Sequence, residues 1–313
     1  MIASNTVSKL RSMLRRFMPS IKVFTIIHWI EKHTASTIAS PQETSGRHMP
    51  GVDYRCISFV QDGPKATLTF ARPDVLNALN RQLIDEALDA FDRLSADTRV
   101  LVLRGAGEKA FAAGADIAEM RERTLWTDLD FGPRRELARR IESAPFPTVA
   151  AINGFALGGG FELALACHLR IASDTAKVGL PETRLGIIPG NGGTARLARL
   201  VGRARALQLI LLGEQVDAAQ AERLGLVNWV VPAAGFDQRV DALTDRLAQL
   251  PPVATRAVID CVTRGEDMTV DQAIENEHRW FQICLASPDK QEGVAAFLEK
   301  RRPKFTGVQA IPT

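Results

Sequence analysis

A glycine-rich stretch at residues 153–162 has residue types and a spacing that could support chemistry. Its three consecutive glycines lie between an apolar, β-branched run at 147–152 and helix-forming residues at 163–166. A strand, a tight turn and a helix in this order would leave unpaired backbone N–H groups at a helix N-terminus, which stabilises an anion. Glu162 would then lie in the first helical turn, close to the anion. A turn that only lets the strand and helix pack closely explains the stretch equally well.

Length and composition are those of a soluble globular protein. The chain has 313 residues, of which 46% are hydrophobic and 24% are charged. Its formal charge of +3 is unevenly distributed, because residues 1–48 contain seven lysines or arginines and only two acids, which leaves the rest of the chain at −2. That remainder has no broad basic field of the kind that recruits nucleic acid.

Cysteine and histidine spacing gives no metal motif. The four cysteines are widely separated and form no Cys-x-x-Cys pair, which indicates free thiols in a reducing compartment. Beyond residue 48 the only histidines are His168 and His278, which are too far apart to suggest ligands of one ion. We therefore expect no metal.

Residues 1–48 differ in composition from the remainder of the chain. They are basic and rich in Ser and Thr, with no acid before Glu31, as in an organellar transit peptide. The other interpretation is a disordered extension, or a start assigned too early with the working chain beginning near Met49. The first predicts the mitochondrial matrix and the second a bacterial-type cytoplasmic protein. The apolar run at 23–30 is too short to span a bilayer, so no membrane association is expected.

The elements that must position the glycine stretch follow from hydrophobic periodicity. Two short runs at 56–60 and 66–70 predict a β-hairpin, and the apolar run at 100–107 predicts a strand buried on both faces. Residues 109–117 are small and lead into a helix. Strand–glycine–helix units repeat across 56–200, which predicts an α/β fold with a largely parallel sheet. A further strand is predicted at 169–172. Helices are predicted at 133–141, 195–200, 204–212, 218–224, 237–249, 253–264, 270–285 and 289–297, so the chain after residue 203 is expected to be mostly helical.

Several motifs occur together in one order and together resemble the enoyl-CoA hydratase/isomerase (crotonase) family. They lie at 72–79, 109–117, 153–162, 179–182, 187–197 and 296–302, and the resemblance covers residues 54–305. It implies a crotonase (ClpP/crotonase-like) spiral of repeated ββα units with an α-helical C-terminal trimerisation region. We accordingly expect an extension at 1–48, an α/β core at 49–250 and a helical region at 251–313. The resemblance also implies trimers or hexamers and no cofactor, since coenzyme A is part of the substrate.

The same resemblance assigns site residues. The N–H groups of Ala115 and Gly159 would form an oxyanion hole for the thioester oxygen of a 2-enoyl-CoA. Glu162 would be the principal base that activates water, and Glu182 the principal acid that protonates the α-carbon. A solvated loop acid is the alternative reading of Glu182 taken alone.

Further residues are candidates for binding coenzyme A and substrate. They lie in the turn at 75–78 and in the loops that carry the oxyanion hole and Glu182: Val75, Ala78, Ala113, Asp116, Ile117, Gly158 and Pro181. Phe297 and Lys300 would cover the adenine end, in one arrangement from a neighbouring subunit, although ordinary helix packing explains Phe297 equally well. Two positions depart from the family: Val75 replaces a residue that is often basic, and His168 replaces a frequent Asp. We interpret His168 as a structural residue in the middle of a helix.

Alternative functions remain within and outside the family. A Δ3-Δ2 enoyl-CoA isomerase, or a hydratase of a branched or carboxylated acyl group such as methylglutaconyl-CoA, would share the fold. Retention of both Glu162 and Glu182 favours hydration, because such isomerases often keep one acid. One branch of the family binds AU-rich RNA, but the −2 charge and the lack of an aromatic and basic surface motif argue against nucleic acid here. A place in fatty-acid β-oxidation is one expectation, and acyl length depends on residues near 120–140.

Overall fold

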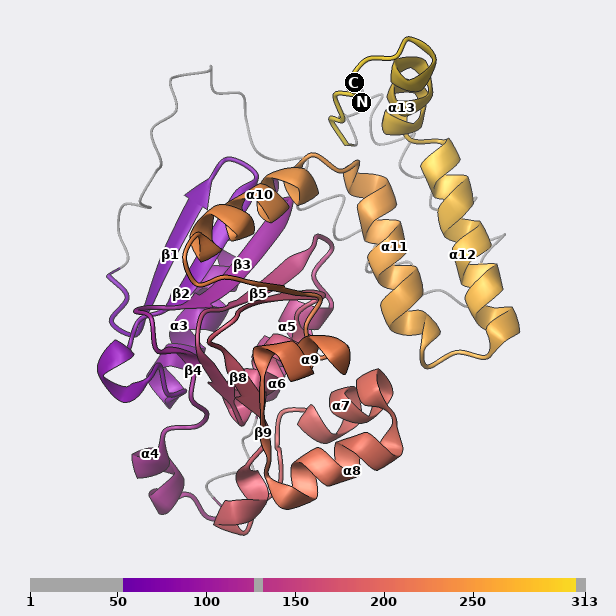
Figure 1. Ribbon diagram of the computed structural model, residues 1–313. Helices are drawn as coiled ribbons and strands as arrows, with labels where there is room; N and C mark the ends of the chain where they lie inside the picture. Colours follow the sequence, from indigo (N-terminus) through magenta and orange to yellow (C-terminus); the bar gives the residue numbers. More distant parts are fainter. Residues whose placement is uncertain (1–52, 127–131, 308–313) are drawn as a thin grey trace, which may run out of the picture. The chain divides into compact units, whose positions relative to one another are not determined.

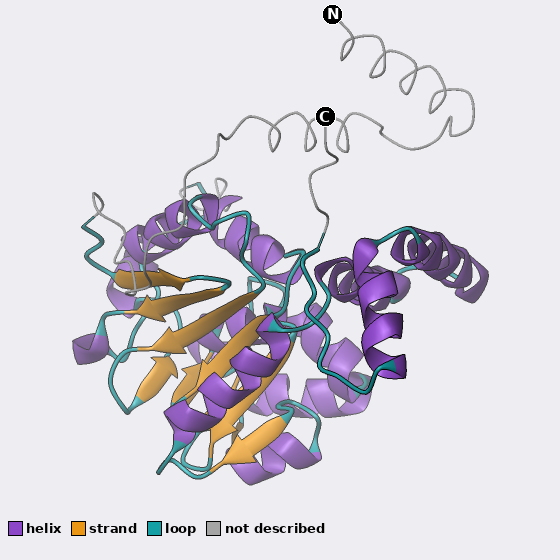
Figure 2. Ribbon diagram, turned by 90° about the horizontal axis from the view of Figure 1, so that it is seen from above, coloured by secondary structure: helices purple, strands orange, loops and turns teal. Residues whose placement is uncertain are grey.

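Figures 1 and 2 show a computed structural model, which describes residues 53–126 and 132–307. The predicted extension at 1–48 lies outside the described residues, so its character and the cellular location stay predictions. The proposed division at residues 250 and 251 also stays a prediction. Within the described ranges, no helix is both long enough and apolar enough to cross a bilayer.

Short strands and helices alternate through the first two thirds of the described chain, and helices follow. The strands are β1 (Ile57–Asp62), β2 (Lys65–Phe70), β3 (Val100–Gly105), β4 (Ala110–Ala112), β5 (Thr148–Ile152), β6 (Phe155–Leu157), β7 (Leu169–Ser173), β8 (Lys177–Gly179), β9 (Gln215–Asp217) and β10 (Trp229–Val231). The α-helices are α3 (Arg81–Asp92), α4 (Ile117–Glu122), α5 (Gly132–Glu142), α6 (Gly159–Ala166), α7 (Gly193–Val201), α8 (Arg203–Leu212), α9 (Ala218–Arg223), α10 (Phe236–Ala248), α11 (Pro252–Gly265), α12 (Val270–Leu285) and α13 (Pro288–Leu298). Two 3-10 helices are η1 (Pro73–Val75) and η2 (Glu182–Leu185).

The strands form two sheets, one large and one small. The larger has the order β1-β2-β3-β5-β7-β10, in which β1 and β2 form the predicted antiparallel hairpin and the other pairs are parallel. The smaller has the order β4-β6-β8-β9, and only its β8–β9 pair is antiparallel. The predicted α/β class with a largely parallel sheet is thus confirmed.

A repeated unit generates both sheets. The pairs β3–β4, β5–β6 and β7–β8 each place their first strand in the large sheet and their second in the small sheet. A helix follows each pair, because the chain must cross over before it can add another parallel strand. This arrangement confirms the expected spiral of ββα units.

Five short strands, β4, β6, β8, β9 and β10, were not predicted from the sequence. β4 and β6 lie in Ala- and Gly-rich segments that we interpreted as loops, and β9 and β10 lie in the part expected to be mostly helical. Each has three residues, so no alternating pattern can develop, and pairing with a neighbouring strand decides its conformation.

Burial follows the layers of the fold. β3 and β5 are buried almost throughout, as their continuous apolar sequences predict. Helix α10 packs on one face of β3, where Phe236 and Val240 meet Val100, Val102 and Val149 (Figure 1). The larger hydrophobic cluster lies beneath α3, α5 and α6, and every residue of α6 is buried.

The last three helices carry many exposed apolar side chains. α11 and α12 pack against each other (Figure 1), yet within this pair only Ala257 is buried. Large exposed side chains on α11–α13 include Val258, Val262, Val270, Ile274, Phe281, Ile283, Phe297 and Leu298. Such a concentration of exposed apolar surface is typical of a contact with another protein surface.

Close packing of α6 on β4 gives a stability prediction. A Cβ atom on Gly160 would lie 2.1 Å from the carbonyl oxygen of Ala112, which belongs to the strand backbone. Gly160→Ala should therefore lower the free energy of unfolding by about 3 kcal/mol, because the strand and helix must separate. Urea denaturation would measure the change.

The matched control is Gly265→Ala at the end of α11. A Cβ atom there would meet Ala273 at an ordinary 3.8 Å, and alanine favours helix more than glycine does. This variant should be as stable as the original or slightly more so. Equal stability of the two variants would contradict the packing argument.

Candidate functional site

The small sheet brings together three segments that are distant in the sequence. β4, β6 and β8 are neighbours and run parallel, so their carboxyl ends lie at one edge of the sheet. The residues that follow these ends are Ala115, Gly159 and Glu182. Equivalent positions in three successive repeats therefore supply the candidate site.

The loop after β4 holds Ala115 between two hydrogen-bonded neighbours. Leu79 donates its N–H to Gly114 O at 2.8 Å, and Asp116 donates its N–H to Leu79 O at 3.1 Å. The amide of Ala115 takes no part in this bridge. Its nitrogen lies 3.9 Å from the point that a Cβ atom on Gly159 would occupy. Within the described chain, no hydrogen bond is assigned to the N–H of either Ala115 or Gly159.

The turn after β6 directs the second amide. Gly158 has φ +50°, a conformation that side chains disfavour, and it donates its N–H to Gly179 O at 2.9 Å. Gly159 is the first residue of α6, so its N–H has no partner within the helix and adds to the positive end of the helix dipole. Two backbone N–H groups without an assigned partner thus lie in adjoining segments, one in the loop after β4 and one at the start of α6.

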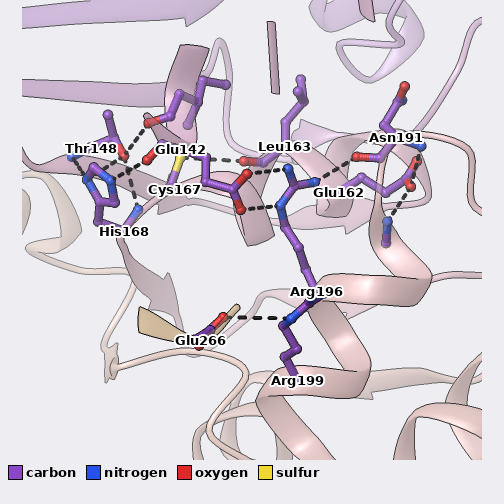
Figure 3. A network of polar contacts seen from close by, with 12 residues as sticks. Glu142, Thr148, Glu162, Leu163, Cys167, His168, Asn191, Arg196, Arg199 and Glu266 are labelled. Atoms are coloured by element: carbon purple, nitrogen blue, oxygen red, sulfur yellow. Dashed lines mark hydrogen bonds and ion pairs between the residues drawn. The ribbon is translucent and has the colours of Figure 1, made fainter. Parts of the chain in front are cut away.

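Glu162 lies in the first turn of α6, as predicted, and only 2% of its surface is exposed. Its Oε1 atom accepts hydrogen bonds from the N–H groups of Asn191 at 2.7 Å and Gly193 at 2.8 Å (Figure 3). Burial raises the pKa of Glu162, while these backbone donors act in the opposite direction. The donors also fix the orientation of the carboxyl group.

An arginine anchors the loop that supplies those donors. Arg196 on α7 donates from Nη1 to Asn191 O at 2.7 Å and forms a two-bond ion pair with Glu142, at 2.8 Å from both Nε and Nη2 (Figure 3). This fork geometry restricts the loop more than a single contact would. Neither Arg196 nor Glu142 was identified from the sequence, because the partners lie 54 residues apart and only the fold brings them together.

The interpretation of His168 as a mid-helix residue was wrong. α6 ends at Ala166, Cys167 adopts an extended conformation, and His168 precedes β7. Its ring contacts Thr148 Oγ1 at 3.1 Å and Glu142 O at 2.9 Å (Figure 3), and burial lowers the pKa of His168. These contacts connect the ends of α5 and α6 to β5. The local apolar run had suggested a longer helix than tertiary contacts allow.

Glu182 follows β8 in η2 and is only partly exposed. Its Oε1 atom lies 3.1 Å from the point that a Cβ atom on Gly158 would occupy. Its Oε2 atom is buried and has no hydrogen-bond partner among the described residues. The pKa of Glu182 is raised to about 7, chiefly by burial and also by the negative charge of Glu162.

The two carboxyl groups therefore have different environments in one place. Glu162 receives backbone donors that favour its ionised form, whereas Glu182 has a buried oxygen without a donor. Burial raises the pKa of both carboxyl groups, and at Glu162 the backbone donors of Asn191 and Gly193 oppose this effect.

The candidate coenzyme A segments lie side by side. Ala113 donates its N–H to Leu76 O at 3.0 Å, which joins the turn at 75–78 to the loop at 113–117. Val75 and Ile117 are exposed, whereas the Asp116 carboxylate is already engaged by Arg72 at 2.9 Å and by the N–H of Ala118. The side chain of Asp116 thus holds the loop and caps α4.

The remaining candidates have fewer described contacts with the site. Pro181 precedes Glu182 at the end of β8. Phe297 on α13 is 82% exposed, and Lys300 follows that helix with φ +54°. The described contacts do not connect Phe297 or Lys300 with the strand ends, so their roles stay predictions.

All four cysteines lie in the described ranges and are unpaired, as expected. In residues 53–126 and 132–307, no group of three or more His, Cys, Asp or Glu side chains is arranged to hold a metal ion.

The raised pKa of Glu182 predicts how stability depends on pH. Its pKa is about 7 in the folded protein and 4.5 in the reference state, so its contribution to stability is complete below pH 4.5 and is lost as pH rises through 7. Glu182→Gln removes this loss. The stability gained over the original protein should be about 2 kcal/mol larger at pH 8 than at pH 5. Urea unfolding of both proteins at pH 5 and pH 8 measures this gain. The same gain in the free energy of unfolding at the two pH values would contradict the prediction.

Comparison with known proteins places the fold and site in context. The chain matches the Enoyl-CoA hydratase/isomerase family over residues 65–309. It is 40% identical to the short-chain-enoyl-CoA hydratase of Clostridium acetobutylicum, covering 77% of this chain and 94% of that protein. It is 38% identical to the 2,3-dehydroadipyl-CoA hydratase of Escherichia coli, with 77% and 94% covered.

Solved structures agree with this match. The crystal structure of an enoyl-CoA hydratase from Bacillus anthracis superimposes with a TM-score of 0.77 at 36% identity, covering 80% of this chain and 99% of that one. The family match spans most of the chain, and the relatives are covered almost completely. The chain therefore belongs to the enoyl-CoA hydratase/isomerase family and has its crotonase fold.

Proposed function

We propose that the protein is an enoyl-CoA hydratase that adds water across the 2,3 double bond of a 2-enoyl-CoA to give a 3-hydroxyacyl-CoA. The observation that carries this proposal is the pair of glutamates, Glu162 and Glu182, beside the two unpaired N–H groups of Ala115 and Gly159. The names of similar proteins support the same reaction.

The two amides act on the thioester oxygen. Attack of water on the β-carbon moves the π electrons toward that oxygen, which gains negative charge. The N–H groups of Ala115 and Gly159 donate to it as the charge develops, and the dipole of α6 adds to their effect. Loss of one such donor typically costs about 3 kcal/mol of transition-state stabilisation.

The two glutamates transfer the protons. Glu162, held by the amides of Asn191 and Gly193, takes a proton from the attacking water as the oxygen–β-carbon bond forms. Glu182, with a pKa of about 7, delivers its proton to the α-carbon as the charge returns from the thioester oxygen. One proton then passes from Glu162 back to Glu182 before the next turnover. The reaction is redox-neutral, and the proposal requires no cofactor.

The coenzyme A moiety would follow the joined segments at 75–78 and 113–117. Exposed apolar side chains of Val75 and Ile117 offer contact to the pantetheine, and the small Ala78 and Ala113 allow it to approach the backbone. Gly158 and Pro181 would border the acyl end. Because the family resemblance places Phe297 and Lys300 there, we assign these two residues to the adenine end.

The base role of Glu162 gives a direct test. Glu162→Gln keeps the shape of the side chain but cannot accept the proton, so turnover should fall about 1,000-fold or more. Loss of enoyl-thioester absorbance with crotonyl-CoA would measure the rate. Glu108→Gln, in the exposed turn between β3 and β4, is the matched control and should leave turnover unchanged.

Product analysis separates the proposal from its alternative. Formation of a 3-hydroxyacyl-CoA supports hydration, whereas a moved double bond without added water would show isomerisation instead. A panel of straight, branched and carboxylated enoyl-CoAs would then identify the acyl group. A place in fatty-acid β-oxidation would follow only from a preference for straight chains.

We further propose that α11–α13 mediate self-association into trimers or hexamers. The support is the exposed apolar surface of these helices, which includes Val262 at 64% and Phe281 at 58% exposure. Burial of such side chains stabilises association through the hydrophobic effect.

A charge placed in this surface should prevent assembly. Phe281→Glu should yield monomers in light scattering coupled to size-exclusion chromatography, because a carboxylate would have to be buried without a partner. Val60→Glu, on the exposed side of β1, is the control and should keep the original mass. Monomers of the unaltered protein, or oligomers of Phe281→Glu, would contradict the assignment.

A further inference from the structure

Asn191 has a backbone that is fixed on both sides. Its N–H donates to Glu162 Oε1 at 2.7 Å, and its carbonyl oxygen accepts from Arg196 Nη1 at 2.7 Å (Figure 3). Both contacts use main-chain atoms. The position of the side chain therefore depends on a loop that the site already holds in place.

The side-chain amide of Asn191 lies at the glycine turn. Its Nδ2 atom is 3.6 Å from the point that a Cβ atom on Gly159 would occupy, and the nitrogen of Ala115 is 3.9 Å from the same point. Asn191 thus lies beside the two amides assigned to the thioester oxygen. Among the described residues, the side chain of Asn191 makes no hydrogen bond that would account for this placement.

The oxygen of this side-chain amide is buried and has no hydrogen-bond partner among the described residues. Neither Asn191 Oδ1 nor Glu182 Oε2, which is also buried, accepts a hydrogen bond from the described residues. Buried polar atoms are normally paired, because losing water without gaining a partner is costly. The two side chains that carry these atoms lie beside Gly158 and Gly159 through their other polar atoms, Glu182 Oε1 and Asn191 Nδ2, which indicates a region that receives a polar group of the substrate.

We propose that Asn191 Oδ1 accepts a hydrogen bond from the reacting water and then from the 3-hydroxyl group of the product. This inference rests on the proposed hydration. Of the two water O–H bonds, one breaks as its proton goes to Glu162, and the other persists as the product hydroxyl. Glu182 keeps its own proton for the α-carbon, so the persisting O–H needs a different acceptor. A neutral amide oxygen supplies one without adding a third negative charge.

Two substitutions separate this role from packing. Asn191→Ala and Asn191→Leu both remove the amide oxygen but keep the backbone N–H that donates to Glu162, and leucine nearly preserves the volume. Both should lower kcat for hydration about 10-fold while the KM for the enoyl-CoA changes little. The enoyl-CoA used is the one that the unaltered enzyme hydrates fastest.

Ligand binding provides a readout that a packing role would not change selectively. Both variants should bind the matching 3-hydroxyacyl-CoA about 10-fold more weakly, yet bind the saturated acyl-CoA unchanged, since it has no hydroxyl group. Exchange of the α-proton of the saturated acyl-CoA in D₂O should also be unchanged, because it uses Glu182 and the two amides without attack on the β-carbon.

Three results would overturn the inference. Equal weakening of both ligands, recovery of kcat by leucine, or an unchanged kcat would each show that Asn191 does not hold the water or hydroxyl. Failure of the unaltered protein to hydrate any enoyl-CoA would instead reject the proposed function. The two failures are therefore distinguishable.

Discussion

The site depends on a carboxyl group that is held in the protein interior. Glu162 is almost fully buried, and its burial is tolerated because two backbone N–H groups of the next loop converge on one oxygen. That loop is in turn held by Arg196 and its two-bond pair with Glu142. A chain of contacts from α5 to α7 therefore serves one purpose, which is to keep a desolvated carboxyl group in a single orientation.

The same environment distinguishes two chemically identical side chains. Glu162 has backbone donors and Glu182 has a buried oxygen without one, and the charge of Glu162 also raises the pKa of Glu182. Environments of this kind separate the protonation behaviour of paired carboxyls, which is how proteins assign acid and base roles. The unpaired oxygen is a local cost to the fold, as expected where a polar substrate completes the hydrogen bonding.

Local sequence patterns predicted the parts of the site that depend on neighbouring residues. The glycine turn and the position of Glu162 follow from an apolar run, three glycines and helix formers in direct succession. Arg196 and Glu142 could not be predicted, because they meet only after α5, α6 and α7 have packed. β4 and β6 were missed because three residues carry no periodic signal. The end of α6 before His168 was missed because contacts with Thr148, 20 residues earlier, decide it.

The origin of the site in three repeats also affects how such a protein can diverge. Ala115, Gly159 and Glu182 each follow a strand of the small sheet, so the pairing of these strands helps to keep their spacing. The long connection between β4 and β5, which includes the region expected near the acyl chain, returns to the large sheet and is not part of that pairing. Insertions or substitutions there can therefore change the region expected to hold the acyl chain without moving the three strand ends of the candidate site. A change of acyl group and retention of the reaction would therefore depend on different parts of the chain.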